Sequence, residues 1–302
     1  MRTPSLTTAT AVASRADTRG YDVKGRWGRW AAGSLAGAAL AAGCSFPPSP
    51  VRTVTVTDKS GAISGIPGTL AAGQYTFSLS NATGGLQLVR LTPGYTQAQL
   101  LSDVGAVFGP PSPGAKAAAE RLYAQAHFVG GANGATRFSA YLIPGSYVAV
   151  DPTGPGGRPE AFTVTPRAVR QNFPAADVAF GGSMLMSGGH ESFAWQVIGK
   201  LKASGGTLRF TTLNGDEPHF LVLAKVKPGR TALQCFSFQG NGANPNCDEV
   251  LSTGVLSTNE TMTMPYTLKG PGTYAIACFV TTPETGQPHA MLGMIRVLPP
   301  VR

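Results

Sequence analysis

The sequence predicts an all-β protein of two tandem Greek-key β-sandwiches, the first with a helical insert. Its 302 residues include 39 glycines and 24 prolines but only 13% charged residues, a composition that suits short strands joined by turns. Segments such as residues 75–79 and 207–211 alternate apolar and polar side chains, as half-buried strands do. The two halves of the chain also resemble each other, which predicts two similar domains, each of two packed sheets.

The first 44 residues show the three-part pattern that is typical of an export signal. Residues 24–30 contain Lys24, Arg26 and Arg29, residues 31–42 form a run of small apolar side chains, and Leu-Ala-Ala-Gly precedes Cys44. This pattern predicts a signal peptide over residues 1–43, and the apolar run is too short to span a bilayer. The final residues resemble a bacterial lipobox, which implies cleavage before Cys44 and lipid attachment to it. The alternative is an ordinary secretory signal with a coincidental cysteine.

We therefore expect an exported protein on the outer face of the cell membrane, held there by its lipid anchor alone. The proline-rich residues 44–52 predict a stiff tether. The predicted domains are residues 53–166 and residues 175–302. Nucleic acid is not an expected partner, because the 18 basic and 13 acidic side chains after residue 43 form no basic cluster.

An internal duplication defines the two domains. Residues 73–81 parallel residues 206–214, and the Pro-Gly-Ser-Tyr sequence ending at Tyr147 parallels the Pro-Gly-Thr-Tyr sequence ending at Tyr274. The first copy has an insert at residues 96–128 with two predicted helices, 97–108 and 115–128. In the second helix Ala118, Leu122 and Ala126 share one face, which we expect to cover a sheet.

The four cysteines suit an oxidising compartment. Cys235 and Cys247 bracket a loop rich in glycine and asparagine and predict a disulfide, worth about 3 kcal/mol for so short a loop. With Cys44 lipidated, Cys278 is left unpaired. An odd cysteine in an exported protein favours a metal ligand, and the alternative is a buried, inert thiol on a core strand.

Four side chains of the C-terminal half together suit a copper ion. Cys278 follows a Gly-x-Tyr strand, His289 and Met294 follow in a His-x-x-x-Gly-Met sequence, and His219 lies about sixty residues upstream. Two histidine nitrogens, one cysteine sulfur and a weak axial methionine form the ligand set of a trigonal blue-copper centre.

The order of these residues resembles that of the cupredoxins, in which an early histidine follows an asparagine and a proline, as His219 does here. The resemblance implies one copper ion bound by His219, Cys278 and His289, with Met294 axial. Familiar cupredoxins leave only a few residues between the cysteine and the second histidine, whereas ten separate them here. Pro283 and Gly286 favour a reverse turn, so we expect a small hairpin that returns His289 to Cys278.

The first copy lacks these ligands. The positions equivalent to His219, Cys278 and His289 hold Leu86, Asp151 and Glu160, respectively. We therefore expect the first sandwich to bind no metal.

The resemblance implies single-electron transfer or copper handling, with a redox or copper-exchange protein docking at an apolar edge presented by His289. We expect no enzyme, because four histidines without a His-x-His pair are too few for a catalytic copper cluster. The rival hypothesis is a copper-free β-sandwich that binds a protein or cell-envelope partner, in which the cysteine, histidines and methionine serve as packing.

Overall fold

The computed structural model describes residues 51–80, 84–108, 114–133, 135–152, 157–168, 171–187, 190–237 and 243–302. The predicted signal peptide, Cys44 and most of the predicted tether lie outside these residues. Within the described part of the chain, no helix is both long enough and apolar enough to cross a membrane. The described residues belong to one compact unit, Ser45–Arg302.

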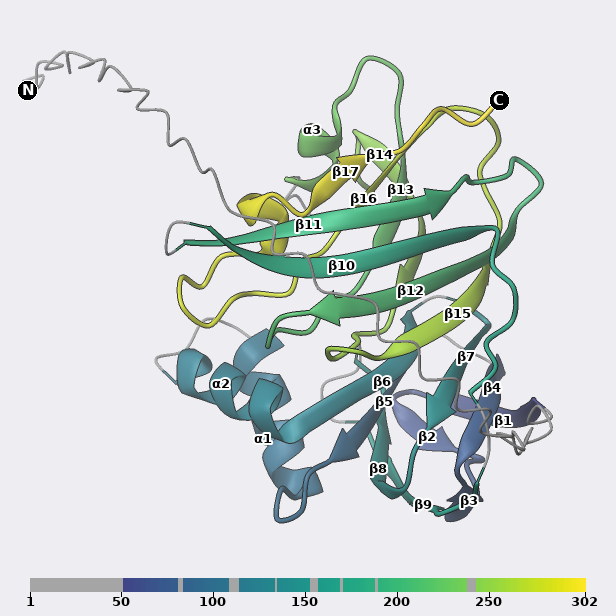
Figure 1. The fold of residues 1–302 in the computed structure, drawn as a ribbon, viewed down its shortest axis with the longest axis vertical. Coiled ribbons are helices and arrows are strands. Elements are labelled where there is room, and N and C mark those ends of the chain that lie inside the picture. Colours follow the sequence, from purple (N-terminus) through teal and green to yellow (C-terminus); the bar gives the residue numbers. More distant parts are fainter. Residues whose placement is uncertain are drawn as a thin grey trace, which may run out of the picture. The chain divides into compact units, whose positions relative to one another are not determined.

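Two mixed sheets pack against each other, so the predicted β-sandwich fold is confirmed (Figure 1). One sheet has the strand order β11 (His190–Gly199), β10 (Val178–Ser187), β12 (Gly206–Asn214), β15 (Thr261–Tyr266), β7 (Arg137–Leu142), β4 (Gly73–Ser80), β1 (Arg52–Lys59) and β2 (Ala62–Ser64). The other has the order β17 (Ile295–Val297), β16 (Thr273–Ala277), β13 (Val222–Val226), β14 (Cys247–Thr253), β6 (Ala126–Asn133), β5 (Gly85–Leu91), β8 (Gly145–Val150), β9 (Glu160–Thr165) and β3 (Thr69–Ala71).

The internal duplication recurs in the strand pairing. β1 pairs antiparallel with β2 and parallel with β4, and β10 repeats this pattern with β11 and β12. β5 lies between β6 and β8, just as β13 lies between β14 and β16. The two copies join through equivalent strands, because β7 pairs with β15 and β6 with β14. Both sheets therefore run through both copies, and the boundary predicted between residues 166 and 175 stays a prediction.

The repeated tyrosines make the same bond in each copy. The Tyr147 hydroxyl donates to the carbonyl of Ile143 (2.8 Å), and the Tyr274 hydroxyl donates to that of Gly270 (2.6 Å). Both rings are buried at the start of a strand, β8 or β16. A buried phenol needs such a partner, because an unpaired hydroxyl in the core is costly.

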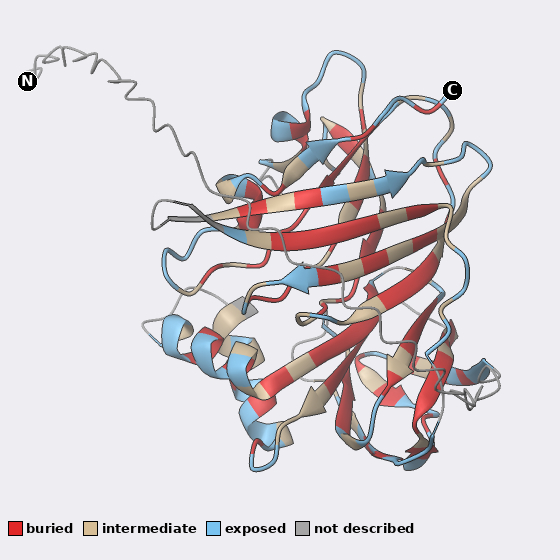
Figure 2. Ribbon diagram, viewed as in Figure 1, coloured by how far each residue is buried: buried red, intermediate tan, exposed pale blue. Residues whose placement is uncertain are grey.

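One hydrophobic core lies between the two sheets and spans both copies (Figure 2). It follows from the alternation of the strands: in β12, Leu208 and Phe210 are fully buried, while the intervening Arg209 is only partly so. Burying a side chain of this size contributes about 1.5–3 kcal/mol relative to leaving it exposed.

The predicted helical insert is confirmed as α1 (Gln97–Phe108) and α2 (Ala115–Gln125). Leu100 and Leu122 of these helices pack with Val89, Phe128 and Val148 of the nine-stranded sheet, so the insert covers a sheet face as expected. The second helix is shorter than predicted, because Ala126 already has extended backbone angles and begins β6. The aromatic and β-branched residues that follow favour a strand.

Candidate metal centre

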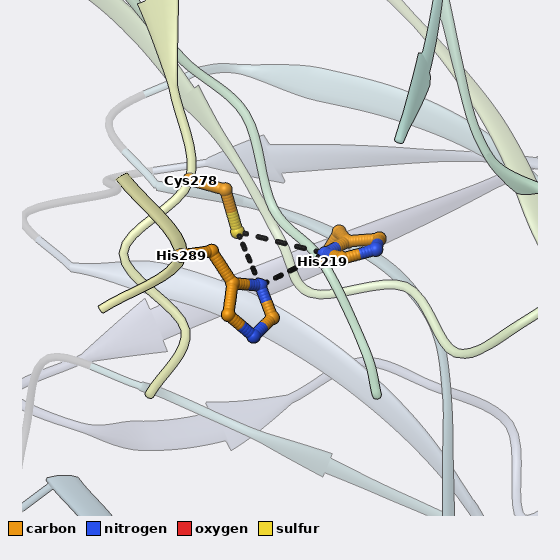
Figure 3. A group of neighbouring side chains, drawn as sticks. All are labelled: His219, Cys278 and His289. Carbon is orange, nitrogen blue, oxygen red and sulfur yellow. Dashed lines mark hydrogen bonds between the residues drawn. The ribbon is translucent and has the colours of Figure 1, made fainter. Parts of the chain in front are cut away.

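Three donor atoms from distant parts of the chain meet at one point (Figure 3). The Nδ1 atoms of His219 and His289 lie 3.0 Å apart. The sulfur of Cys278 lies 3.9 Å from the first of these nitrogens and 3.6 Å from the second. All three residues are fully buried. The structure thus brings together the three side chains that the sequence predicts as equatorial ligands.

His219 lies in the connection between β12 and β13, and two backbone hydrogen bonds to Leu256 hold it in place. Its N–H donates to the carbonyl of Leu256 (2.9 Å), and its carbonyl accepts from the Leu256 N–H (2.7 Å). The next residue, Phe220, donates its N–H to the sulfur of Cys278 at 3.5 Å. This connection therefore supplies one nitrogen donor and a hydrogen bond to the sulfur donor.

The ten residues between Cys278 and His289 fold out and back. Thr281 forms an antiparallel bridge with Pro288, and the turn is closed by the Thr282 N–H to Gln287 carbonyl bond (3.0 Å). The His289 N–H donates to the carbonyl of Val280 (2.8 Å), which fixes the second histidine beside the cysteine. The loop between Cys278 and His289 therefore has the hairpin form expected from its turn residues.

Met294 follows a short 3₁₀ helix, η1 (His289–Leu292), and a glycine. Gly293 has φ 104°, a left-handed conformation that favours glycine, and it turns the chain back toward the cysteine. The Met294 N–H donates to the His289 carbonyl (2.9 Å), and the Cys278 N–H donates to the Met294 carbonyl (3.3 Å). The Met294 side chain is fully buried beside His219: a Cβ at Gly182 of β10 would lie 2.9 Å from atoms of both.

Burial keeps the donor groups neutral when no metal is bound. It lowers the pKa of both His219 and His289 to about 3 and raises the pKa of the Cys278 thiol to about 12. A neutral imidazole keeps a lone pair on one ring nitrogen, whereas the thiol must lose its proton before its sulfur binds a metal. Metal uptake at this site therefore releases a proton.

A buried acid that the sequence analysis did not single out also belongs to the site. One carboxylate oxygen of Glu217 accepts a hydrogen bond from the Thr282 hydroxyl (2.6 Å). The other oxygen lies within hydrogen-bond distance of His289 Nε2 (2.6 Å). Burial raises the pKa of Glu217 to about 7. Its position two residues before His219, in an otherwise turn-like segment, is the only signal the sequence offers for it.

Aromatic residues of β11 close the other side of the site, and the sequence analysis missed them too. Phe193 stacks on the His289 ring, and Trp195 donates its indole N–H to the Met294 carbonyl (3.0 Å). Tyr123 of α2, in the first copy, donates its hydroxyl to the Thr281 carbonyl (3.0 Å). The helical insert of the first copy therefore contacts the loop between Cys278 and His289 in the second copy.

In the first copy, the equivalent positions carry structural contacts instead. Leu86 is fully buried in the core. An Asp151 carboxylate oxygen accepts from the Gly85 N–H (3.1 Å), and a Glu160 oxygen accepts from the Ile66 N–H (3.1 Å). Each of these three side chains thus has a packing or hydrogen-bonding role of its own.

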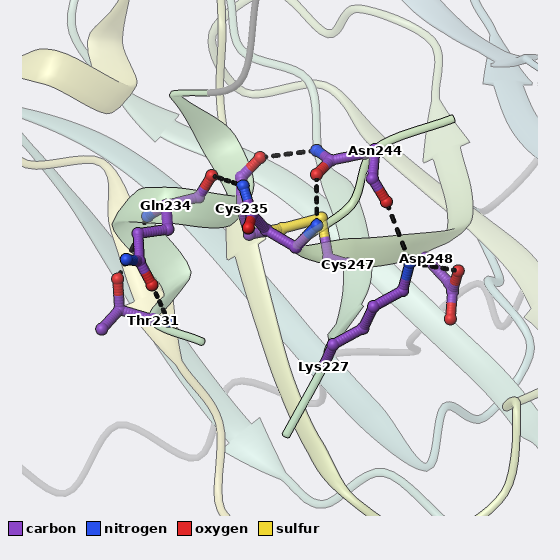
Figure 4. Close-up of a disulfide and its surroundings, with 8 residues drawn as sticks. Lys227, Thr231, Gln234, Cys235, Asn244, Cys247 and Asp248 are labelled. Carbon is purple, nitrogen blue, oxygen red and sulfur yellow. Dashed lines mark hydrogen bonds and ion pairs between the residues drawn. A yellow bond between two sulfur atoms is a disulfide. The ribbon is translucent and has the colours of Figure 1, made fainter. Parts of the chain in front are cut away.

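The predicted disulfide between Cys235 and Cys247 is confirmed (Figure 4). It ties α3 (Ala232–Phe236) to the start of β14, and α3 begins with a capping box formed by Thr231 and Gln234. Among the residues that the structure describes, Cys278 is then the free cysteine. Its sulfur is available to a metal.

The surface near the site differs from the expected docking edge. His289 is fully buried and presents no edge to solvent. The large apolar side chain exposed near it is that of Met291, with 58% of its surface accessible. The ring is covered because Phe193 and Glu217 occupy two of its sides.

The donor set and its spacing fit a copper ion. Three donors in a trigonal plane about 2.0–2.3 Å from an ion, the range of zinc–nitrogen and zinc–sulfur bonds, lie roughly 3.5–3.8 Å from one another. The separations observed are 3.0–3.9 Å. Soft sulfur ligands with imidazoles suit copper, whereas magnesium and calcium prefer oxygen ligands. His219, Cys278, His289 and Met294 together match a copper ligand set.

Comparison with known proteins finds no matching family model and no matching curated protein. Among solved structures, the chain is similar to the reduced auracyanin of Roseiflexus castenholzii, with 19% identity, 32% of this chain and 77% of the other covered, and a TM-score of 0.22. It is also similar to the copper nitrite reductase of Nitrosomonas europaea, with 13% identity, 82% and 93% covered, and a TM-score of 0.24. A blue copper oxidase from Nitrosomonas europaea has 12% identity, 82% and 85% coverage, and a TM-score of 0.22.

These matches correct one expectation. The sequence analysis predicts that the protein is not an enzyme, yet a nitrite reductase and a copper oxidase are among the similar structures.

Proposed function

We propose that the protein binds one copper ion through His219, Cys278 and His289, with Met294 as a weak fourth ligand, and serves in single-electron transfer or copper handling. The observation that carries this proposal is the convergence of two imidazole nitrogens and a free thiol, all fully buried, at separations of 3.0–3.9 Å. The nearby thioether completes the set.

The rigidity of the ligand backbone supports electron transfer. Cys278 and Met294 are joined by a backbone hydrogen bond, as are Met294 and His289, and the Ala290 N–H donates to the Cys278 carbonyl (2.7 Å). Bound copper would supply one-electron chemistry, because it can pass between Cu(I) and Cu(II). A ligand set held in one arrangement favours this exchange because little has to move. The partner is then a redox or copper-exchange protein.

The same proposal places the protein on the outer face of the cell membrane, anchored through a lipid on Cys44. The basic, apolar and small-residue segments before Cys44 support this location. The disulfide between Cys235 and Cys247 suits the oxidising environment outside the cell. Replacing Cys44 with serine should release the protein from membranes, and a mature protein whose measured mass lacks a lipid would overturn this part of the proposal.

The copper proposal is tested by metal content and colour. The purified protein loaded with Cu(II) should hold one copper and show an intense thiolate-to-copper band toward the red end of the visible spectrum. Cys278→Ser should abolish the band, while His127→Gln, a change on β6 outside the ligand set, should keep it. A wild-type protein that stays colourless and metal-free would leave the copper-free binding protein as the better explanation.

A further inference from the structure

A buried chain of hydrogen bonds links the loop between Cys278 and His289 to the segment that carries His219. The Thr282 hydroxyl donates to Glu217 Oε1, and Glu217 Oε2 lies 2.6 Å from His289 Nε2. Thr282 and His289 are fully buried and Glu217 is 6% exposed. Both carboxylate oxygens of Glu217 therefore contact the same loop: one contacts Thr282 within it, and the other contacts His289 at its end.

The two nitrogens of His289 face opposite environments. Nε2 points at the Glu217 carboxylate, and Nδ1 lies 3.0 Å from His219 Nδ1 and 3.6 Å from the Cys278 sulfur. The stacked ring of Phe193, 3.7 Å away between centroids, restricts rotation of the imidazole out of this orientation. The ring is thus held with one nitrogen toward the acid and the other toward the donor cluster.

This arrangement decides where the proton of a neutral imidazole resides. Such a ring has one N–H donor and one acceptor nitrogen, and an ionised carboxylate can only accept. With Glu217 ionised, Nε2 donates to it, which leaves Nδ1 with a free lone pair. His219 is different, because its buried Nε2 has no hydrogen-bond partner among the described residues. Its Nδ1 can then carry the proton and donate to His289.

We propose that Glu217 is a positioning residue, which fixes the proton of His289 on Nε2 and keeps Nδ1 ready to bind the metal. The inference rests on the proposed copper site. Partners that hold the far nitrogen of a histidine ligand typically set its tautomer and raise metal affinity. The Thr282 contact gives Glu217 a second role, because it ties the long loop between Cys278 and His289 to the segment that carries His219.

The proton position can be measured without copper. In ¹⁵N NMR spectra of the metal-free protein at pH 8, we expect His289 to carry its proton on Nε2. Glu217→Gln should keep this tautomer, because the amide oxygen can accept the same bond, whereas Glu217→Ala should shift His289 toward the Nδ1–H form. Glu260→Gln is the matched control, since burial also raises the pKa of Glu260 to about 7. An Nδ1–H form of His289 in the wild type would overturn the inference.

Copper affinity provides a second readout. Glu217→Ala should weaken copper binding by about 10- to 100-fold, and Glu217→Gln should restore most of it. If the wild type binds no copper but shows the expected tautomer, the proposed function fails and the assignment of the proton stands. If the wild type binds copper and Glu217→Ala changes neither tautomer nor affinity, the inference fails alone. Should the alanine variant not fold, the wild-type tautomer decides.

Discussion

Phe193 lies flat on the imidazole of His289, with ring centroids 3.7 Å apart and planes inclined by 12°. The same phenyl ring meets His219 nearly edge-on, with centroids 5.8 Å apart. Phe193 belongs to β11, an edge strand, and is only 3% exposed. One side chain from a strand without a ligand therefore contacts both imidazoles and limits how far they can turn.

Replacing Phe193 with leucine should loosen both histidines. We expect the free energy of unfolding to fall by about 1–3 kcal/mol, because buried ring contacts are lost, and the copper band to broaden or shift. Thermal unfolding and the visible spectrum measure the two effects. Phe77→Leu is the matched control, since Phe77 stacks on Phe138 in the first copy (5.3 Å). It should destabilise the protein and leave the spectrum unchanged; equal spectral changes in both variants would contradict this role of Phe193.

The meeting of His219, Cys278 and His289 could be predicted from the sequence, but the surroundings of these side chains could not. Cys278 and His289 are recognisable because they follow a strand and a turn in a fixed order. Phe193 and Gly182 lie on β11 and β10, and their contacts with the site depend on how one sheet packs over the other. No spacing along the chain encodes that packing.

The fold shows the same division between local and distant information. Alternation within segments such as β12 predicted the strands, and the repeat predicted two similar halves. The pairing of β7 with β15 and of β6 with β14 is a contact between copies, which a repeat does not specify. The end of α2 at Gln125 was also missed, since pairing with β5 outweighs the helical pattern beyond it.

Gly182 leaves room for two of the proposed ligands, His219 and Met294. A Cβ on this residue would lie 2.9 Å from His219 Cδ2 and 2.9 Å from Met294 Cε. Gly182→Ala should therefore displace the histidine or the methionine, lower the stability by about 1–3 kcal/mol and alter the copper spectrum. Gly68→Ala is the control, because a Cβ there meets no atom within 4 Å. A Gly182→Ala protein with wild-type stability and spectrum would show that the site has spare room.

The buried histidines predict a pH effect on the metal-free protein. Burial lowers the pKa of His219 to about 3 from its ordinary value of 6.5. Between these values the unfolded chain binds a proton that the native protein does not, so stability falls as the pH falls. For one histidine the slope is about 1.4 kcal/mol per pH unit.

His219→Asn should remove this contribution. Urea unfolding at pH 6, 5 and 4 in the presence of a chelator compares the variant with the wild type. The wild type should lose about 1.4 kcal/mol more per pH unit than the variant. Equal slopes for the two proteins would mean that His219 is not kept neutral by burial.

Tyr123 connects the helical insert of the first copy to the loop between Cys278 and His289 in the second. Its hydroxyl donates to the Thr281 carbonyl at 3.0 Å, three residues after Cys278. Tyr123→Phe leaves that carbonyl without this donor, so we expect a loss of about 1 kcal/mol in stability and faster release of copper to a chelator. Tyr95→Phe is the matched control, because the Tyr95 hydroxyl donates to Asp103 of α1 (2.8 Å). It should cost similar stability without changing copper release, whereas equal release rates for Tyr123→Phe and the wild type would show that the insert does not restrain the loop.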